Sequence, residues 1–276
     1  MSKYNNMKSI PVSSIPKWKL KKAIHEWAEG SNALESLITT CYKKNVKTNG
    51  SHAGVGPYIG FDYTKEADIL TNVFTVIEEI EDFQILLEPD GGNPLSGKDW
   101  YVPIITLGSF ADSPEEAERL FTRIEDKIIE EKKENNPLLD IFTFFIDKES
   151  GLSFRLRRYD NYNKNNDKKY VFKIASKKVP KDREDYYKRI LSNAGLTEIP
   201  FNIEVCPYQE WKIESDDYND IMNSIKDAAD YIIMNYALEP PTSENEILDK
   251  QLLTRFKRKE LNQKQIEKYF KSLSHR

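Results

Sequence analysis

A glycine-rich segment around one histidine has the residue types best suited to chemistry. Residues 50–60 hold four of the 11 glycines of the chain, together with Ser51 and His52. Glycine permits positive φ and lets a ligand approach backbone amides, which can form an anion-binding nest. The serine adds a hydroxyl group, and the histidine titrates near neutral pH. We therefore expect this segment to bind a phosphate-bearing ligand, a nucleotide or RNA. The predicted contacts are Gly50, Ser51, Gly54, Gly56 and Tyr58.

If a reaction takes place at this segment, His52 is the candidate general acid or base. Asp62, on the strand predicted to follow, is the candidate that orients His52 or an attacking water. The backbone amides of the segment would then stabilise developing negative charge. A structural interpretation is also open, in which the glycines form a tight connection between two strands and His52 serves packing. Both an enzyme and a non-catalytic binding protein fit these residues.

A predicted β-hairpin carries a second candidate surface. Large apolar residues recur at every second position over 152–157 and 170–175, on the two sides of a polar loop. When the large apolar residues face the core, Arg155, Arg157 and Lys173 share the opposite face, where they can bind phosphate groups or an acidic partner. Alternatively, these charges belong to a solvated outer face and discourage pairing with other sheet edges.

Positive charge is also concentrated near the C-terminus. Residues 252–276 contain eight basic and two acidic residues, so this segment carries +6 and the rest of the chain −10 of a net charge of −4. An amphipathic helical segment is predicted over 244–273. The basic segment 244–276 can bind RNA, DNA or an acidic protein partner, or dock on the acidic body of its own chain.

Several kinds of site are disfavoured. Cys41 and Cys206 are too few for a disulfide framework and have no CxxC partner, so neither zinc nor a redox motif is indicated. The three histidines form no HExxH motif, and no GxSxG, GxxxxGK[ST] or GxGxxG motif names a nucleophile or a cofactor. No apolar run approaches the roughly 18 residues of a spanning helix, and the first residues lack the apolar region of a signal peptide. We expect a cytoplasmic protein that does not enter a membrane.

Apolar periodicity and capping residues predict the elements. The expected helices cover 17–29, 31–45, 64–80, 114–134, 180–194, 215–236 and 244–273, with Ser31, Ser113 and Ser215 among the N-caps. The expected strands flank the glycine turn within 46–63 and cover 152–156, 170–174 and 201–208. Strands are also expected at 83–88 and 101–107, where an antiparallel pair or a long loop is equally possible. The apolar run 137–145 fits a buried strand or a buried helix, and its Ile and Phe content favours a strand. No internal repeat with the period of a solenoid occurs.

The mixture of helices with antiparallel strand pairs predicts an α+β fold, in one or two subdomains, rather than a doubly wound sheet. The predicted domains are 1–136 with the glycine-histidine segment, 137–241 with the basic hairpin, and a basic helical segment at 242–276. The leading hypothesis is binding of a nucleotide or RNA at residues 50–60. The alternative is a non-catalytic protein-interaction module, such as a phage or mobile-element regulator or inhibitor. Richness in Lys, Asn and Ile is typical of AT-rich genomes and favours a bacterial or phage origin.

Overall fold

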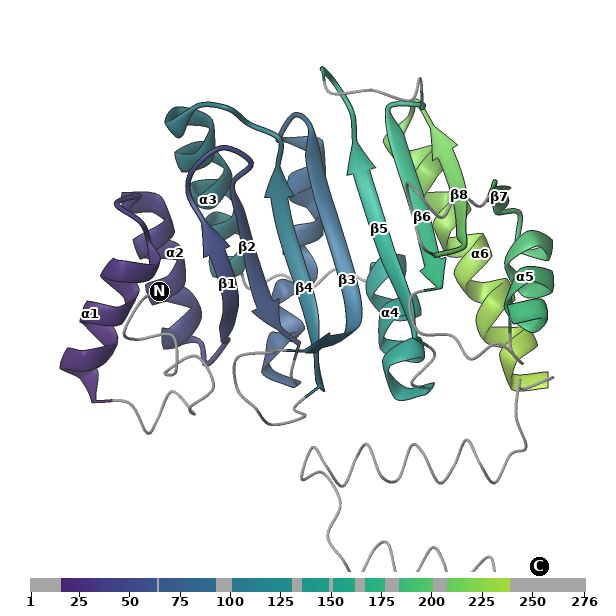
Figure 1. The fold of residues 1–276 in the computed structure, drawn as a ribbon, viewed down its shortest axis with the longest axis horizontal. Helices are drawn as coiled ribbons and strands as arrows, with labels where there is room; N and C mark the ends of the chain where they lie inside the picture. The colour runs from purple at the N-terminus through teal and green to yellow at the C-terminus, as the bar shows by residue number, and fades with distance from the viewer. Residues whose placement is uncertain are drawn as a thin grey trace, which may run out of the picture.

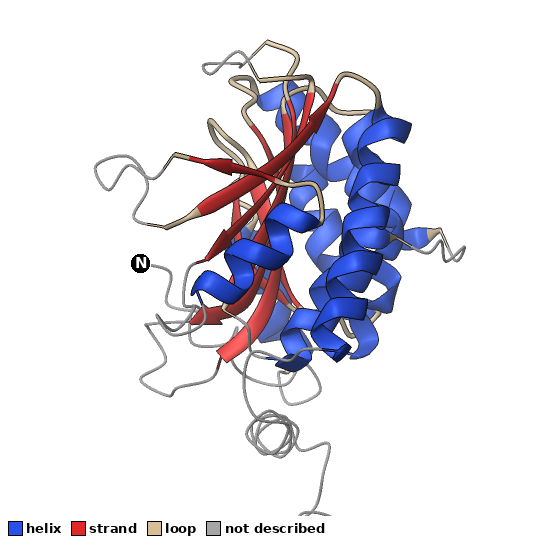
Figure 2. Ribbon diagram, turned by 90° about the vertical axis from the view of Figure 1, so that its right-hand side faces the viewer, coloured by secondary structure: helices blue, strands red, loops and turns tan. Residues whose placement is uncertain are grey.

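The computed structural model describes residues 16–63, 65–92, 101–130, 136–148, 151–161, 167–176, 184–200 and 208–238. These residues form the predicted α+β fold. Within them, eight strands make one antiparallel sheet in the order β1-β2-β4-β3-β5-β6-β8-β7 (Figure 1). Figure 2 shows that the helices gather on one side of this sheet. The other side of its central strands is free of helices in the described residues, and we call it the open face.

The helices and strands have the following bounds. The helices are α1 (Lys17–Trp27), α2 (Asn32–Lys43), the 3-10 helix η3 (Lys65–Glu78), α3 (Pro114–Ile129), α4 (Pro137–Lys148), α5 (Glu184–Asn193) and α6 (Tyr218–Leu238). The strands are β1 (Thr48–His52), β2 (Tyr58–Asp62), β3 (Phe83–Gly92), β4 (Tyr101–Ser109), β5 (Leu152–Arg158), β6 (Tyr170–Ser176), β7 (Thr197–Ile199) and β8 (Glu210–Ser215).

Serine caps begin two of the helices, as predicted. The Ser31 hydroxyl accepts a hydrogen bond from the Leu34 amide at the start of α2. The Ser113 hydroxyl accepts one from the Glu116 amide at the start of α3, where proline occupies the first turn. Each cap satisfies an amide that has no partner within its helix, which stabilises a helix by about 1 kcal/mol.

The start of α6 differs from the prediction. Ser215 is the last residue of β8, and the helix begins at Tyr218. Asp217 caps it instead, because its Oδ1 accepts hydrogen bonds from the amides of Asn219 and Asp220. A carboxylate at this position also interacts favourably with the helix dipole.

The order of the elements contains the same arrangement twice. One copy runs α2-β1-β2-η3-β3-β4-α3 and the other α4-β5-β6-α5-β7-β8-α6. The copies contribute strands in the same spatial order, β1-β2-β4-β3 and β5-β6-β8-β7, and they join where β3 pairs with β5. Within each copy, a helix connects two hairpins and crosses over one intervening strand. The predicted boundary at 136–137 falls between the two copies, which share a single sheet.

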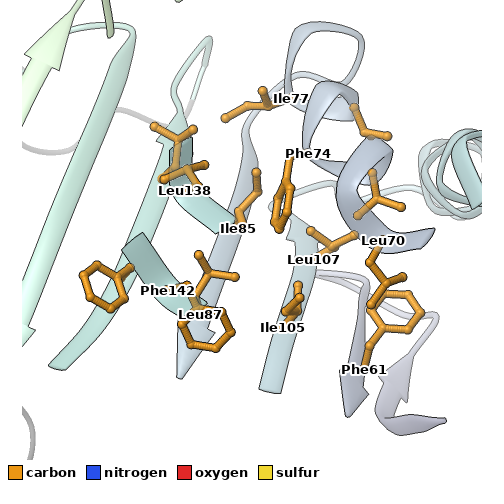
Figure 3. Close-up of a cluster of buried hydrophobic side chains, with 14 of the residues drawn as sticks. Phe61, Leu70, Phe74, Ile77, Ile85, Leu87, Ile105, Leu107, Leu138 and Phe142 are labelled. Carbon is orange, nitrogen blue, oxygen red and sulfur yellow. The ribbon is translucent and has the colours of Figure 1, made fainter. Parts of the chain in front are cut away.

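The helices cover the sheet through side chains that alternate along the strands. On the helical side, buried residues of β3 and β4 face η3 and α4 (Figure 3). The residues at the centre of this core are Phe61, Leu70, Phe74, Ile77, Ile85, Leu87, Ile105, Leu107, Leu138 and Phe142. Each of these side chains stabilises the fold by about 1.5–3 kcal/mol through burial.

The apolar run at 137–145 is a helix, and the expectation of a strand is wrong. Asn136 caps this helix, α4, by accepting a hydrogen bond from the Leu138 amide. The helix packs between the sheet and α6, so it is apolar over most of its circumference. Such a helix resembles a buried strand in composition. The buried residues at helical spacing are Leu138, Ile141, Phe142 and Phe145.

Other differences concern short or β-branched segments. The helix expected over 64–80 is a 3-10 helix at Lys65–Glu78. Its β-branched residues have a lower α-helical propensity, and the Thr75 hydroxyl donates to the carbonyl of Asn72, three residues earlier. The short strands β7 and β8 were absent from the prediction. The strand expected at 201–208 and the helical segment expected at 244–273 fall, apart from residue 208, outside the described residues.

Cys41 is fully buried on the apolar side of α2. Burial and the nearby carboxylate of Glu125 raise the pKa of its thiol, so the reactive thiolate is strongly disfavoured. Among the described helices, none combines the length and the apolar character needed to cross a membrane.

Candidate functional site

The glycine-rich segment connects β1 to β2 in a tight turn. Gly56 has a φ of 68°, in the left-handed region that favours glycine, and its amide donates to the carbonyl of Ala111 at 3.0 Å. The Ala53 amide donates to Oε2 of Glu29 at 3.0 Å. Two of the amides expected to bind an anion are therefore already used within the protein.

Glycines also make room for Tyr58 on the open face. A Cβ atom at Gly50 would lie 3.7 Å from Cε2 of the Tyr58 ring. At Gly108, on the neighbouring strand β4, a Cβ atom would lie 2.9 Å from the carbonyl oxygen of Pro57 and 3.0 Å from Cβ of Tyr58. The second approach is too close for any residue except glycine unless the backbone shifts. This packing supports a structural role for the concentration of glycines.

His52 lies against a carboxylate that the sequence analysis did not single out. Oε2 of Glu29 is 2.9 Å from Nδ1 of the imidazole, and the two side chains are 44% and 43% exposed. A Cβ atom at Gly54 would lie 2.8 Å from Nε2 of His52, so glycine is required there for this ring position. A histidine oriented by a carboxylate can transfer a proton. The same carboxylate repels a phosphate that approaches the ring.

The other chemical groups predicted at this segment do not meet His52. Asp62 lies at the far end of β2, about 13 Å along the strand from the residue opposite His52. Its carboxylate accepts a hydrogen bond from the side chain of Asn49 at 2.9 Å. The Ser51 hydroxyl donates to the carbonyl of Trp27 at 3.1 Å. The structure therefore separates His52 from Asp62.

The β5-β6 hairpin presents its cations on the open face, as predicted. Arg155 of β5 pairs with Lys173 of β6, and Lys173 pairs with Lys212 of β8. Side chains of directly opposed residues point to the same side of a sheet, so these three cations form a row across three strands. Arg157 follows two residues after Arg155 and shares its face. We call Arg155, Arg157, Lys173 and Lys212 the cationic face.

The two lysines of the cationic face have carboxylate partners. Nζ of Lys212 lies 2.8 Å from Oδ1 of Asp167 and 2.7 Å from Oε2 of Glu214. Burial lowers the pKa of Lys212, but these two carboxylates outweigh burial and raise the pKa above its ordinary value. Nζ of Lys173 lies 3.5 Å from Oε2 of Glu210. Both lysine charges are thus largely compensated within the protein.

The two arginines are less well compensated. Nη1 of Arg157 donates to the hydroxyl of Tyr159 at 3.1 Å, and its guanidinium carbon lies 5.3 Å from the centre of the Phe110 ring. Nε of Arg155 and Nε of Arg157 are both buried without a hydrogen-bond partner among the described residues. Burial and the positive charge of Arg157 hold the pKa of Arg155 below its ordinary value. The environment therefore disfavours the charge that Arg155 carries.

The two predicted sites lie apart on the same face. Paired residues run from His52 through Tyr58, Gly108 and Gln84 to Arg157, across five strands. Four strand spacings separate the ends of this row by about 19 Å. One small ligand therefore cannot contact both His52 and Arg157.

Two residues of these surfaces, Glu29 and Lys212, were not predicted from the sequence. Glu29 is 23 positions before His52, and no local pattern connects them. Lys212 lies in Glu-Trp-Lys-Ile-Glu, where apolar and charged residues alternate with the period of a strand. That alternation identifies β8 and places the side chains of Lys212 and Trp211 on opposite faces of the sheet.

No family model, curated protein or solved structure matches the chain. The described residues contain no group of three or more His, Cys, Asp or Glu side chains placed to hold a metal ion. The basic segment 244–276, predicted to bind an acidic protein, lies outside the described residues.

Proposed function

We propose that this protein binds a phosphate-bearing ligand, such as a nucleotide, on the open face of its sheet through Arg155 and Arg157. The observation that carries this proposal is the pair Arg155 and Arg157 on one face of β5, whose Nε atoms are buried without a hydrogen-bond partner among the described residues. The two like charges repel each other, and the charge of Arg157 helps to hold the pKa of Arg155 below its ordinary value. A bound phosphate would relieve this repulsion.

Within the cationic face, the two arginines are better candidates for contact with the ligand than the two lysines. Lys173 and Lys212 already lie within ion-pair distance of carboxylates. The carboxylates of Glu210 and Glu88 raise the pKa of Arg155, but burial and the charge of Arg157 lower it by more. A planar guanidinium donates two parallel hydrogen bonds to a phosphate, which a lysine ammonium cannot do.

Neighbouring aromatic groups support the role of Arg157. The ring of Phe110 packs against the guanidinium, and the Tyr159 hydroxyl accepts one of its hydrogen bonds. A guanidinium whose face is covered by a ring donates through its edge. These contacts restrict the orientation of Arg157 before a ligand arrives, which reduces the entropy lost on binding.

The cationic face suits a phosphate better than the 50–60 segment does. At that segment, the amides of Ala53 and Gly56 have partners, and the carboxylate of Glu29 lies beside His52. The proposal therefore assigns the ligand predicted from the sequence to Arg155 and Arg157. Nucleotides are abundant in the cytoplasm, the location expected from the sequence.

Thermal unfolding in the presence of nucleotides tests the proposal. The full chain would be heated with ATP, GTP, UTP or inorganic pyrophosphate at constant ionic strength. A ligand that binds only the folded state raises Tm in proportion to RT ln(1 + [L]/Kd). We expect at least one of these compounds to raise Tm of the wild type, and the Arg155→Gln/Arg157→Gln variant to lose that shift.

Two control variants locate the effect. Arg119→Gln/Arg123→Gln removes the same charge from the exposed side of α3, and it should keep the ligand-induced shift. His52→Ala should also keep it. A shift lost only in His52→Ala would return the site to the 50–60 segment. No shift with any of the four compounds would overturn the proposal and favour the protein-interaction hypothesis.

A further inference from the structure

Helix α1 presents an exposed tryptophan among lysines. Trp18 is 62% exposed, the highest value for an aromatic side chain among the described residues. Nζ of Lys19 lies 5.5 Å and Nζ of Lys22 lies 5.8 Å from the centre of its ring. Lys17 and Lys21 are also exposed on this helix. Two lysine ammonium groups thus lie near one solvent-exposed indole, and two further lysines are exposed on the same helix.

The remaining apolar residues of α1 are committed to the fold. Ala23, Ile24 and Trp27 are buried, with exposed fractions of 0%, 5% and 4%. At 100° per residue, Trp18 points away from these residues, and Lys21 and Lys22 lie on its side of the helix, three and four positions later. The outward surface of α1 therefore carries one aromatic ring with lysines beside it and no apolar stripe. Two turns later on the same side, Nδ1 of His25 lies 2.8 Å from Oε2 of Glu35.

We infer that this outward surface of α1 binds single-stranded nucleic acid. A base would stack on the indole of Trp18, and lysines around it would contact the phosphates on either side. Aromatic stacking platforms within a basic surface are the means by which proteins bind single strands without strong sequence preference. We call Trp18, Lys17, Lys19, Lys21 and Lys22 the α1 surface.

The geometry favours a nucleic acid over an anionic membrane. An interfacial helix inserts a continuous apolar face into the lipid. In α1 that face is occupied by contacts with the rest of the protein, through Ala23, Ile24 and Trp27. A single indole with adjacent ammonium groups matches one base and its flanking phosphates.

The α1 surface is independent of the proposed ligand at Arg155 and Arg157. Figure 1 shows α1 beyond the β1 edge of the sheet, whereas the arginines lie on β5 in the second half. Loss of nucleotide binding in the arginine variant and loss of oligonucleotide binding in α1 variants are therefore separate results. Either proposal can fail while the other holds.

Fluorescence anisotropy with labelled dT15 and U15 tests the inference on the full chain. We expect Trp18→Ala to weaken binding by about tenfold or more, since a stacked base contributes that much to affinity. Trp18→Phe retains an aromatic ring and should recover most of the loss. Because Trp18 is exposed, both variants should keep the wild-type circular dichroism spectrum and Tm.

The salt dependence gives a second readout. Lys21→Gln/Lys22→Gln should make the slope of log K against log salt shallower by about 1.4, as expected for two fewer phosphate contacts on a single strand. Lys188→Gln/Lys226→Gln removes the same charge from α5 and α6 and should leave the slope unchanged. Equal effects of the two pairs would show a contribution of net charge alone and overturn the assignment to α1. Binding that Trp18→Ala leaves unchanged, or α1-dependent binding to phosphatidylglycerol vesicles without binding to either oligonucleotide, would also overturn it.

Discussion

The carboxylate of Glu29 joins the end of helix α1 to the turn between β1 and β2. Its Oε2 lies 2.9 Å from Nδ1 of His52 and accepts a hydrogen bond from the Ala53 amide at 3.0 Å. Glu29 itself has a φ of 53°, which costs about 1–2 kcal/mol for a residue other than glycine. Contacts of the side chain therefore offset strain in its own backbone.

Removing this carboxylate should destabilise the protein. We expect Glu29→Ala to lower the free energy of unfolding by about 1–2 kcal/mol, since it removes a charge-assisted hydrogen bond to Ala53 and a half-exposed contact to His52. Urea denaturation measures the change. Glu26→Ala, at an exposed position in the last turn of α1, should change stability by less than about 0.5 kcal/mol. Equal effects of the two substitutions would show that Glu29 does not hold the turn.

The glycines of the open face should differ sharply in their tolerance of a methyl group. Gly108→Ala would place Cβ 2.9 Å from a backbone oxygen, and we expect a loss of about 1–3 kcal/mol. Gly60→Ala, on the adjacent strand, would place Cβ no closer than 3.5 Å to any atom and should be nearly neutral. Thermal unfolding compares the two. Similar Tm values for both variants would contradict the close approach of β2 and β4 at Gly108.

The cationic face should be electrostatically strained in the absence of a ligand. Arg155→Met keeps an apolar stem and removes the charge that repels Arg157, so we expect it to raise the free energy of unfolding by about 0.5 kcal/mol at low salt. The gain should shrink as salt screens the repulsion. Lys212→Met removes a cation that contacts Asp167 and Glu214, and it should destabilise. Destabilisation by both variants, measured by urea denaturation, would remove the electrostatic basis of the proposed site.

An acid-sensitive contact joins the end of β5 to the turn before β3. Asp160 Oδ2 lies 2.6 Å from Nε of Arg158, and the Asp160 amide donates to Asp82 at 2.9 Å. Arg158 also donates to the carbonyls of Ile77 and Glu78, at 3.1 and 2.7 Å. These bonds join residues 77–82 to residues 158–160, two segments that are distant in the sequence.

The pKa of Asp160 fixes the direction of its pH dependence. Burial raises this pKa, but Arg158, the Asp82 amide and Lys169 outweigh burial and hold it below the ordinary value of 3.8. Because the folded state binds the proton less tightly than the unfolded state, the stabilisation is complete above pH 3.8 and is lost as the pH falls through the lower, folded pKa. Asp160→Asn should therefore destabilise at pH 7, and its difference from wild type should shrink in acid.

Urea denaturation between pH 7 and pH 3 measures this difference. At pH 7 we expect a loss of about 1–2 kcal/mol for Asp160→Asn. Asp216→Asn removes a carboxylate whose pKa is also lowered, by Lys168, but whose side chain is 66% exposed, and its effect should be smaller. A difference between Asp160→Asn and wild type that stays constant over this pH range would show that the charge of Asp160 does not stabilise the fold.

Local patterns in the sequence were sufficient for many elements. Ser31 and Ser113 mark helix starts because a capping hydroxyl acts within three residues. Alternation over 152–157 predicted both the β5 strand and the shared face of Arg155 and Arg157, because side chains on a strand have a period of two. The strand prediction for 137–145 was wrong, because an almost uniformly apolar segment shows neither the period of a helix nor that of a strand.

The sequence by itself determined the α+β class, the apolar faces of most helices and the charges that lie together on one strand. Only the tertiary structure decided that Glu29 lies beside His52, that Asp62 does not, and that Lys212 continues the row of Arg155 and Lys173. The physical reason is the distance along the sequence over which each interaction acts. Capping, helical spacing and strand alternation act between residues a few positions apart, whereas strand order and helix docking depend on the packing of the whole core, which brings distant residues together.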